Sequence, residues 1–427
     1  MVQQHTIKPF PVEKIRPLFP ALASSPDFTF FDNAAGAQIP QTVLQAVNRQ
    51  LIDRNVQRGG RFAKSRQLDQ AIDRARENVA TFLNARDPKE VAFGMNATSF
   101  IRVVSLGIGE DLKKRDEIIL TNLDHEANVS TWLSLKQQGA KFRWWNMRED
   151  GSLHLEDLQS LLSSRTRLVA CTVTSNALGN VVDVAAAARL AHQAGAEIFL
   201  DCVHYAPHGS IDVQSWNCDY LTCSGYKIFA PHMGFLWGRY EALVHLRTFR
   251  EEFVANEPPH KIEAGTFVYE NVVGMDSAIG YLADLGRMVA DGGHSDSRRA
   301  LLVTAMDAIR SYEETLSLEV LKVLEDCEAV VYGVNGDPGV SHRVPTVLFN
   351  IDGIAPAVIS EELAASGFGI RDGHMYSPRL MKHLGLSPDS GAVRVSLVHY
   401  NTLEEIKRFG SALQEVVQHQ RSRYSAK

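Results

Sequence analysis

The segment that decides the fold covers residues 197–238 and reads EIFLDCVHYAPHGSIDVQSWNCDYLTCSGYKIFAPHMGFLWG. It contains short apolar runs separated by polar segments, and similar runs alternate with helical patterns through the first two-thirds of the chain. This alternation is typical of stacked β-α-β units around a mostly parallel sheet, so the predicted fold class is α/β. The predicted strands lie at 28–31, 90–94, 117–121, 141–145, 167–173, 197–201, 219–223 and 234–238.

Helices are expected between these strands. The clearest covers residues 65–85, where apolar residues recur on one face. Beyond about residue 290 the strict alternation of strands and helices is lost. We therefore expect a large domain over 28–290 and a smaller α+β domain formed by 1–27 and 291–427.

The C-terminal part has its own pattern of elements. Two helical stretches are expected within 297–325, ahead of a group of short apolar runs. A final helix opens with a capping box, in which Thr402 and Glu405 satisfy each other's backbone N–H groups. The predicted strands of this part lie at 330–334, 346–352, 367–371 and 392–398.

The composition excludes several classes of protein. The chain of 427 residues carries 44 Lys and Arg against 50 Asp and Glu, so it lacks the basic surface of a protein that binds nucleic acid or an anionic membrane. Hydrophobic residues make up 45%, which is ordinary for a folded globular protein. The five cysteines show no metal-ligand spacing and fit a reduced compartment. With no apolar run of signal-peptide or membrane-spanning length, we expect a cytoplasmic protein without a metal site.

Two side chains within 197–238 suggest a chemistry. Asp201 ends the first apolar run, at the edge where ligands of open α/β sheets bind. Lys227 follows the second run, within a turn of small residues at 224–227. These positions suit pyridoxal phosphate, because the lysine can form a Schiff base and the aspartate can pair with the pyridinium nitrogen. By composition alone, a surface lysine and a capping aspartate remain the alternative.

Other segments add to this pair and extend over nearly the whole chain. They include FFDNAAGAQIP at 30–40, LDHEAN at 123–128, VTSNALGN at 173–180, IEAGT at 262–266 and RVSLVHYNTLEE at 394–405. With these segments the sequence resembles the class V aminotransferase family of fold-type I pyridoxal phosphate enzymes, and within it the cysteine desulfurases and selenocysteine lyases. The resemblance implies a mostly parallel seven-stranded sheet in the large domain and pyridoxal phosphate as the cofactor.

The resemblance also implies which residues bind the cofactor. Lys227 would form the Schiff base, Asp201 would pair with the pyridinium nitrogen, and His125 would stack on the ring and move protons near neutral pH. The phosphate would lie at the start of a helix at Ala97 and Thr98, where backbone N–H groups converge. The other implied cofactor contacts are Asn176, His204, Ser224, Tyr226 and Thr266, the last supplied across a dimer interface.

A second group of residues implies an amino-acid substrate. Arg394 matches the arginine that grips the α-carboxylate, for which a planar guanidinium fork is well suited. Asn176 matches an amide that lies between the cofactor and that carboxylate. Arg371 and Arg58 align with active-site arginines, the latter reaching over from the other subunit, and solvated surface charge is the alternative for both. The resemblance thus implies a small amino-acid substrate and a homodimer in which Arg58 and Thr266 complete the partner's site.

One departure from these relatives concerns the reaction. The desulfurases carry a cysteine whose thiolate attacks the substrate sulfur, and Tyr376 takes its position in the segment RDGHMY at 371–376. A phenol with a pKa of about 10 cannot hold a persulfide. We therefore expect a C–S lyase that acts by β-elimination on a cysteine-derived substrate, with Tyr376 lining the substrate pocket. Transamination and epimerisation remain open alternatives, and a catalytically silent scaffold is disfavoured by the intact Lys227 and Asp201.

Overall fold

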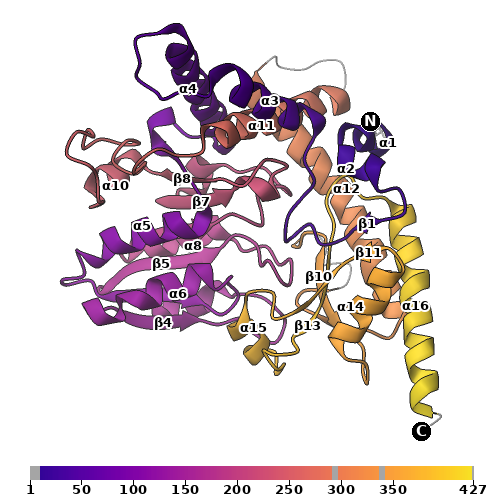
Figure 1. The fold of residues 1–427 in the computed structure, drawn as a ribbon. Helices are drawn as coiled ribbons and strands as arrows, with labels where there is room; N and C mark the ends of the chain where they lie inside the picture. Colours follow the sequence, from indigo (N-terminus) through magenta and orange to yellow (C-terminus); the bar gives the residue numbers. More distant parts are fainter. Residues whose placement is uncertain (1–9, 291–296, 336–341, 426–427) are drawn as a thin grey trace, which may run out of the picture.

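The centre of the protein is a seven-stranded sheet (Figure 1). The computed structural model describes residues 10–290, 297–335 and 342–425. β8 runs antiparallel to both of its neighbours, and the other neighbouring strands of the sheet are parallel, so the predicted α/β class with a mostly parallel seven-stranded sheet is confirmed. In spatial order the strands are β2 (Val91–Gly94), β8 (Gly234–Gly238), β7 (Tyr220–Ser224), β6 (Glu197–Asp201), β5 (Thr166–Thr172), β3 (Glu117–Thr121) and β4 (Lys141–Trp145).

The burial of the strands explains their sequences. Every residue of β3, β7 and β8 is buried, and apolar residues make up most of each strand, as expected of strands that are covered on both faces. β4 is an edge strand. Its first four residues alternate between exposed and half-buried, and its last residue, Trp145, is buried in the core. The continuous apolar runs in the sequence therefore correspond to the internal strands.

Helices cover both faces of the sheet. Successive side chains along a strand point to opposite faces, so the buried strands have apolar side chains to cover on each face. In β3, Ile119 belongs to one hydrophobic cluster, whereas Ile118 and Leu120 belong to another. The helices of the first cluster are α3 (Gln41–Arg54), α4 (Ala63–Leu83, predicted at 65–85), α7 (Leu155–Leu161), α8 (Val184–Gln193), α9 (Val213–Trp216) and α11 (Tyr269–Val289). The helices of the second are α5 (Ala97–Gly109), α6 (Ala127–Leu133) and α10 (Tyr240–His245).

A four-stranded antiparallel sheet forms the C-terminal part of the chain. The predicted capping box is present, since the Glu405 N–H donates to Thr402 Oγ1 at 3.1 Å and the Thr402 N–H donates to the Glu405 carboxylate at 3.0 Å. The strands in spatial order are β12 (Arg371–Gly373), β13 (Ala392–Ser396), β10 (Thr346–Asn350) and β9 (Val330–Tyr332). The helices beside them are α14 (Pro356–Ala365), α15 (Pro378–His383) and α16 (Leu403–Ser425).

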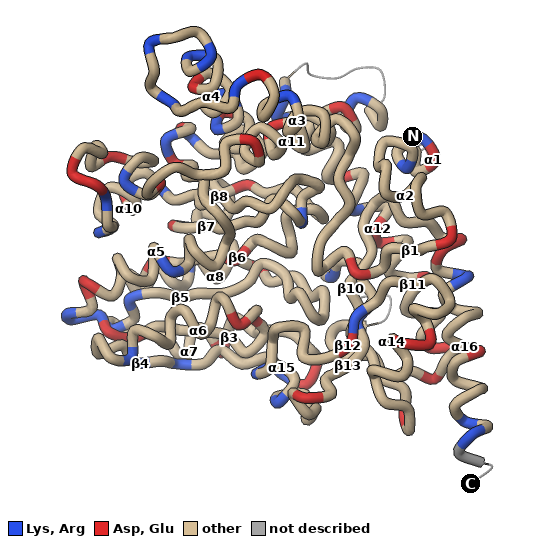
Figure 2. The backbone as a smooth tube through the Cα atoms, in the orientation of Figure 1, with Lys and Arg blue, Asp and Glu red and all other residues tan. Residues whose placement is uncertain are grey.

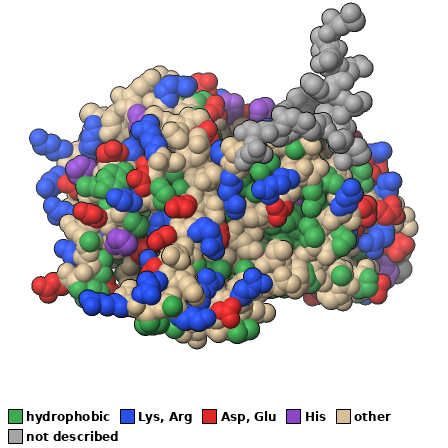
Figure 3. All heavy atoms as spheres, turned by 90° about the horizontal axis from the view of Figure 1, so that it is seen from above, with side chains coloured by type: hydrophobic (Ala, Val, Ile, Leu, Met, Phe, Trp, Pro, Cys, Tyr) green, Lys and Arg blue, Asp and Glu red, His purple; other side chains and the backbone are tan. Residues whose placement is uncertain are grey.

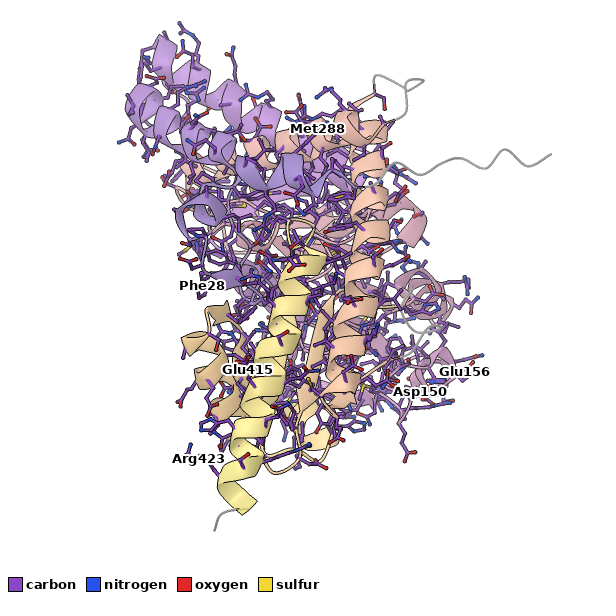
Figure 4. All side chains as sticks on the ribbon, turned by 90° about the vertical axis from the view of Figure 1, so that its right-hand side faces the viewer. Phe28, Asp150, Glu156, Met288, Glu415 and Arg423 are labelled. Atoms are coloured by element: carbon purple, nitrogen blue, oxygen red, sulfur yellow. The ribbon has the colours of Figure 1, made fainter. Side chains whose placement is uncertain are left out.

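One long helix replaces the two helical stretches expected within 297–325. This helix, α12 (Arg298–Asp326), is continuous and lies beside α16 (Figure 4). Its first half, including Ile309, packs in the hydrophobic cluster of the large sheet, and its second half, including Leu324, packs in the cluster of the C-terminal sheet. The prediction of two helices was wrong. The backbone of α12 is continuous, but its buried face packs in one hydrophobic cluster in the first half and in another in the second half.

The strand expected at 28–31 lies outside the large sheet. β1 (Thr29–Phe30) pairs in parallel with β11 (Phe368–Gly369), and Asp32 then bridges to Ser396 at the end of β13. The predicted domain limits stay a prediction, because β1 and α12 both join the two parts.

Two short helices, α1 (Val12–Ile15) and α2 (Pro20–Ser24), precede β1. Short 3₁₀ helices occupy Arg16–Leu18, Pro88–Glu90, Ser134–Gln138 and Gly225–Lys227.

Charged residues of both signs are distributed over the molecule. Figure 2 shows basic and acidic positions interspersed along the backbone, and the face seen in Figure 3 mixes positive, negative and apolar side chains. Among the residues that the structure describes, no helix is long and apolar enough to cross a membrane.

Candidate active site

A cavity lies at the carboxyl ends of β5, β6 and β7, the edge at which the sequence predicted a ligand. The strand register places Thr172 beside Asp201, so residues far apart in the sequence meet there. Each predicted cofactor residue other than Thr266 lines this cavity, although the binding roles remain predictions. The lining residues are Ala97, Thr98, Ile101, His125, Ala127, Thr172, Thr174, Asn176, Asp201, Val203, His204, Ser224, Tyr226 and Lys227.

Lys227 enters the cavity from the 3₁₀ helix that directly follows β7. Its side chain is buried, and burial together with the nearby positive charge of Arg394 lowers the pKa of Lys227 to about 8. The carboxylate of Asp201 acts in the opposite direction on that pKa. A lysine with a pKa near 8 presents a substantial neutral fraction at physiological pH, which is the form that attacks carbonyl carbons and accepts protons.

Asp201 lies at the bottom of the cavity, where burial raises its pKa. The Val203 N–H donates to its carboxylate at 3.0 Å. Sequence analysis missed a second buried carboxylate, Asp124, whose pKa is raised to about 7 by burial and by the charge of Asp201. The position of Asp124 directly before His125 in LDHEAN was the signal by which the sequence could have indicated it. Two neighbouring carboxylates in a dry site favour a cationic ligand atom, such as a protonated ring nitrogen.

His125 is a neutral imidazole in this environment. Burial, followed by the positive charges of Lys227 and Arg394, lowers the pKa of His125 to about 4. Its Nδ1 accepts a hydrogen bond from the Ala127 N–H at 3.0 Å, so the ring proton resides on Nε2. A neutral, fixed ring of this kind can lie flat against another aromatic ring.

Unsatisfied polar atoms show that the cavity is built for a polar ligand. Thr174 Oγ1 and His204 Nδ1 are buried and have no hydrogen-bond partner among the described residues. His204 Nε2 is engaged with Thr346 Oγ1 at 3.0 Å, which fixes the ring. Burial lowers the pKa of His204 well below its usual range, and the neighbouring His208 adds to this. Buried polar atoms without partners are rare in folded proteins and point to an absent ligand.

The start of α5 supplies a site for an anion at the same cavity. Ala97 and Thr98 line the cavity, and the Asn96 side chain caps the helix by accepting from the Ser99 N–H at 2.8 Å. The first N–H groups of a helix have no partner within it and attract phosphate. A Cβ at Gly234 would come within 2.5 Å of the Asn96 carbonyl carbon, so glycine lets β8 approach this helix start. The carboxylates, lysine, imidazole and helix start together fit pyridoxal phosphate.

The arginines predicted to bind the substrate are joined by a carboxylate that sequence analysis missed. Asp32 Oδ1 accepts from Arg394 Nη2 at 2.8 Å, and Asp32 Oδ2 accepts from Arg371 Nε at 2.9 Å. Arg394 Nη1 also donates to the Asn176 carbonyl at 2.8 Å, while its buried Nε has no partner among the described residues. The Nε–H and the second N–H of each terminal nitrogen of Arg394 thus remain as donors for a ligand. The position of Asp32 within FFDNAAG was a signal for its importance.

The loop at 374–377 closes over Asn176. The Asn176 side-chain amide donates to the Met375 carbonyl at 2.7 Å, and Ser377 Oγ donates to Asn176 Oδ1 at 3.2 Å. Tyr376 is 52% exposed, and its ring centroid lies 5.6 Å from that of His125. The structure therefore brings the predicted substrate residues Tyr376, Asn176, Arg371 and Arg394 to one side of the cavity.

Two predicted site residues lie away from the cavity of their own protomer. Arg58 forms an ion pair with Asp69 at 2.9 Å, and Thr266 is exposed on the segment before α11. Their predicted action at a partner's active site remains a prediction. No group of His, Cys, Asp and Glu within 10–290, 297–335 and 342–425 is arranged to hold a metal ion.

Comparisons with known proteins agree with this geometry. A family described as "Aminotransferase class-V" matches residues 29–409. The chain is 35% identical to an "aminotransferase-like protein" of Gibberella zeae, covering 96% of this chain and 99% of that protein. It is 34% identical to a "probable cysteine desulfurase" of Synechocystis sp., covering 91% of this chain and 90% of that protein. The solved structure of a cysteine desulfurase from Thermococcus onnurineus superposes with a TM-score of 0.85 at 25% identity, covering 96% of this chain and 99% of that one. The chain therefore belongs to the class V aminotransferase family and is an enzyme similar to the cysteine desulfurases of that family.

Proposed function

We propose that the protein binds pyridoxal phosphate and acts on a small L-amino acid derived from cysteine, breaking its C–S bond by β-elimination. The observation that carries this proposal is the buried Lys227 with a pKa near 8, facing Asp201 in one cavity beside Arg394. Lysine and aspartate suit the cofactor, and the arginine suits an amino-acid carboxylate.

Each residue has a role that follows from its surroundings. When bound, pyridoxal phosphate supplies an electron sink for the bonds at the substrate's α-carbon. Lys227 Nζ accepts the proton from Cα, because its lowered pKa leaves part of the lysine neutral near neutral pH. Asp201 would hold the ring nitrogen, and His125 would stack on the ring. Arg394, oriented by Asp32 and the Asn176 carbonyl, binds the α-carboxylate through its remaining donors.

The cysteines support elimination over transfer of sulfur to the protein. All five are buried. Burial and the neighbouring Cys223 raise the pKa of Cys202 well above its usual range, so its reactive thiolate is disfavoured. Tyr376 occupies the loop position in which the related desulfurases carry their cysteine. Sulfur is therefore expected to leave as a free thiol or sulfide.

The proposed assembly is a homodimer. Arg58 and Thr266 lie outside their own cavity, as expected of residues that serve a partner's site. Large apolar side chains are also exposed near these segments, among them Ile52 at 82% and Phe253 at 88% exposure. An interface between two protomers would bury these side chains.

Product analysis tests the reaction. The protein loaded with pyridoxal phosphate should convert L-cysteine or S-ethyl-L-cysteine into pyruvate, ammonia and an equal amount of sulfide or ethanethiol. Lys227→Ala serves as the control and should form none of these products. Alanine as the carbon product, together with a labelled persulfide on Cys202 or Cys223, would instead show desulfurase chemistry. Conversion of a 2-oxo acid into an amino acid would show the alternative, transamination, and loss of optical activity without cleavage would show epimerisation.

A further inference from the structure

The loop that carries Tyr376 is held in a conformation that non-glycine residues rarely adopt. Met375 and Tyr376 both have positive φ values, 51° and 59°. For a bulky residue such as tyrosine this is a clear outlier, and such strain is typical of functional sites. Two successive residues with positive φ are unfavourable for an unconstrained loop, so the surrounding contacts must hold this conformation.

Hydrogen bonds from the active site hold this loop in place. The Asn176 amide binds the Met375 carbonyl at 2.7 Å, and the Glu126 N–H binds the Tyr376 carbonyl at 2.8 Å. The Tyr376 N–H donates to His374 Nδ1 at 3.0 Å. Asn176 lines the cavity, and Glu126 directly follows the cavity residue His125. The loop is thus fixed by the same elements that hold the cofactor site.

The ring of Tyr376 lies next to His125, which lines the cofactor cavity. Its ring lies 5.6 Å from that of His125, with an angle of 30° between the planes. A negative charge on Tyr376 would raise the pKa of both Arg371 and Arg394, so the hydroxyl lies within electrostatic range of the two guanidinium groups. At 52% exposure the side chain is also open to solvent, from which a proton can be replaced.

We propose that the Tyr376 hydroxyl is the general acid that protonates the leaving sulfur, a role which rests on the elimination proposed above. Lys227 Nζ takes the proton from Cα, and the electron pair of the Cα–H bond becomes the Cα–Cβ double bond. The electron pair of the Cβ–S bond passes to sulfur, which takes the proton of the Tyr376 hydroxyl. The products are the thiol and 2-aminoacrylate, which water converts to pyruvate and ammonia. The Tyr376 phenolate then regains a proton from solvent, and the Lys227 ammonium group gives its proton back to solvent.

Two other groups compete for this role. His125 is neutral, and its Nδ1 already accepts from the Ala127 N–H, so it can offer only the weakly acidic Nε2–H. Lys227 becomes an ammonium group after it takes the Cα proton and could return that proton to sulfur. Leaving groups of different basicity separate Tyr376 from Lys227, because a substitution of the acid affects only those leaving groups that need a proton.

The test compares Tyr376→Phe with the unchanged protein on two substrates. Ethanethiolate leaving from S-ethyl-L-cysteine is strongly basic and needs a proton, whereas chloride leaving from β-chloro-L-alanine needs none. We expect kcat for S-ethyl-L-cysteine to fall about 100-fold or more, and kcat for β-chloro-L-alanine to fall less than about 5-fold. Tyr332→Phe, in β9 of the C-terminal sheet, is the matched control and should show no such difference.

Two further readouts separate an acid from a structural residue. The visible absorbance and the dissociation constant of bound pyridoxal phosphate should be the same in Tyr376→Phe and the unchanged protein. The KM for S-ethyl-L-cysteine should also stay the same, since the hydroxyl is proposed to donate a proton and not to bind the carboxylate.

Each failure has a distinct meaning. Equal losses on both substrates would overturn the acid role and leave Tyr376 as a residue that shapes the pocket. Small losses on both would assign the protonation to Lys227. If the unchanged protein forms no pyruvate from either substrate, the proposed elimination itself is wrong, and the role of Tyr376 falls with it.

Discussion

Asp32→Asn probes how the two substrate arginines are held. Asp32 is the only carboxylate that binds Arg394 among the described residues, and the Arg394 side chain is 2% exposed. Asparagine keeps the size of the side chain and removes its charge, so Arg394 becomes a buried cation without a counter-charge. Breaking a buried ion pair costs about 3–5 kcal/mol. Because the Asp32 side chain is 22% exposed, solvent screens part of the pair, and we expect a loss of about 2–3 kcal/mol.

Chemical denaturation of the purified protein measures this loss as a change in the free energy of unfolding. Asp157→Asn is the matched control, because Asp157 binds Arg148 at the same 2.8 Å but both side chains are exposed. Exposed pairs contribute less than about 1 kcal/mol. Asp32 also raises the pKa of Lys227, so Asp32→Asn should lower that pKa further. Equal destabilisation by the two substitutions would refute the assignment of Asp32 as the counter-charge of Arg394.

Three other outcomes are expected. Borohydride reduction of the loaded protein should place the pyridoxyl group on Lys227, and a label on a different lysine would remove Lys227 from its role. Attachment of pyridoxal phosphate to the cofactor-free protein should speed up as the pH rises through about 8, because the pKa of Lys227 is lowered and its neutral amine is the reactive form; a rate that is flat from pH 6 to 9 would contradict this. Mixing Lys227→Ala with Arg58→Ala protomers should restore about a quarter of the activity, since half of the dimers are mixed and each has one intact site; light scattering that shows an active monomer would exclude it.

The parts of the fold that the sequence predicted are those decided by local patterns. Internal strands such as β6 and β7 contain short apolar runs, and α4 shows a regular apolar face, so their positions follow from these local patterns. The pairing of β1 with β11 could not be predicted, because two residues carry no periodicity and their partner lies in the C-terminal part of the chain. The continuity of α12 was missed because its apolar face serves two different hydrophobic clusters.

The candidate site shows the same division. Asp201 and Lys227 were predicted because Asp201 ends one apolar run and Lys227 lies in the turn after the next, and both positions are visible in the sequence. Asp32 and Asp124 were missed because their importance comes from partners on other elements, such as Arg394 for Asp32. Ion pairs of this kind depend on the tertiary structure, and a single sequence does not reveal which charges meet.

The bonds of Asp32 also determine when the active site can be completed during synthesis. The residues that line the cofactor cavity all lie between positions 97 and 227, so the ribosome synthesises them before the C-terminal part of the chain. Asp32 emerges before them, but its partners Arg371 and Arg394 follow 339 and 362 residues later. The nascent chain can therefore shape its cofactor cavity while the carboxylate-binding site is still missing. Contacts so distant in sequence form slowly, so the two ion pairs of Asp32 are expected to form late in the folding of the newly made chain.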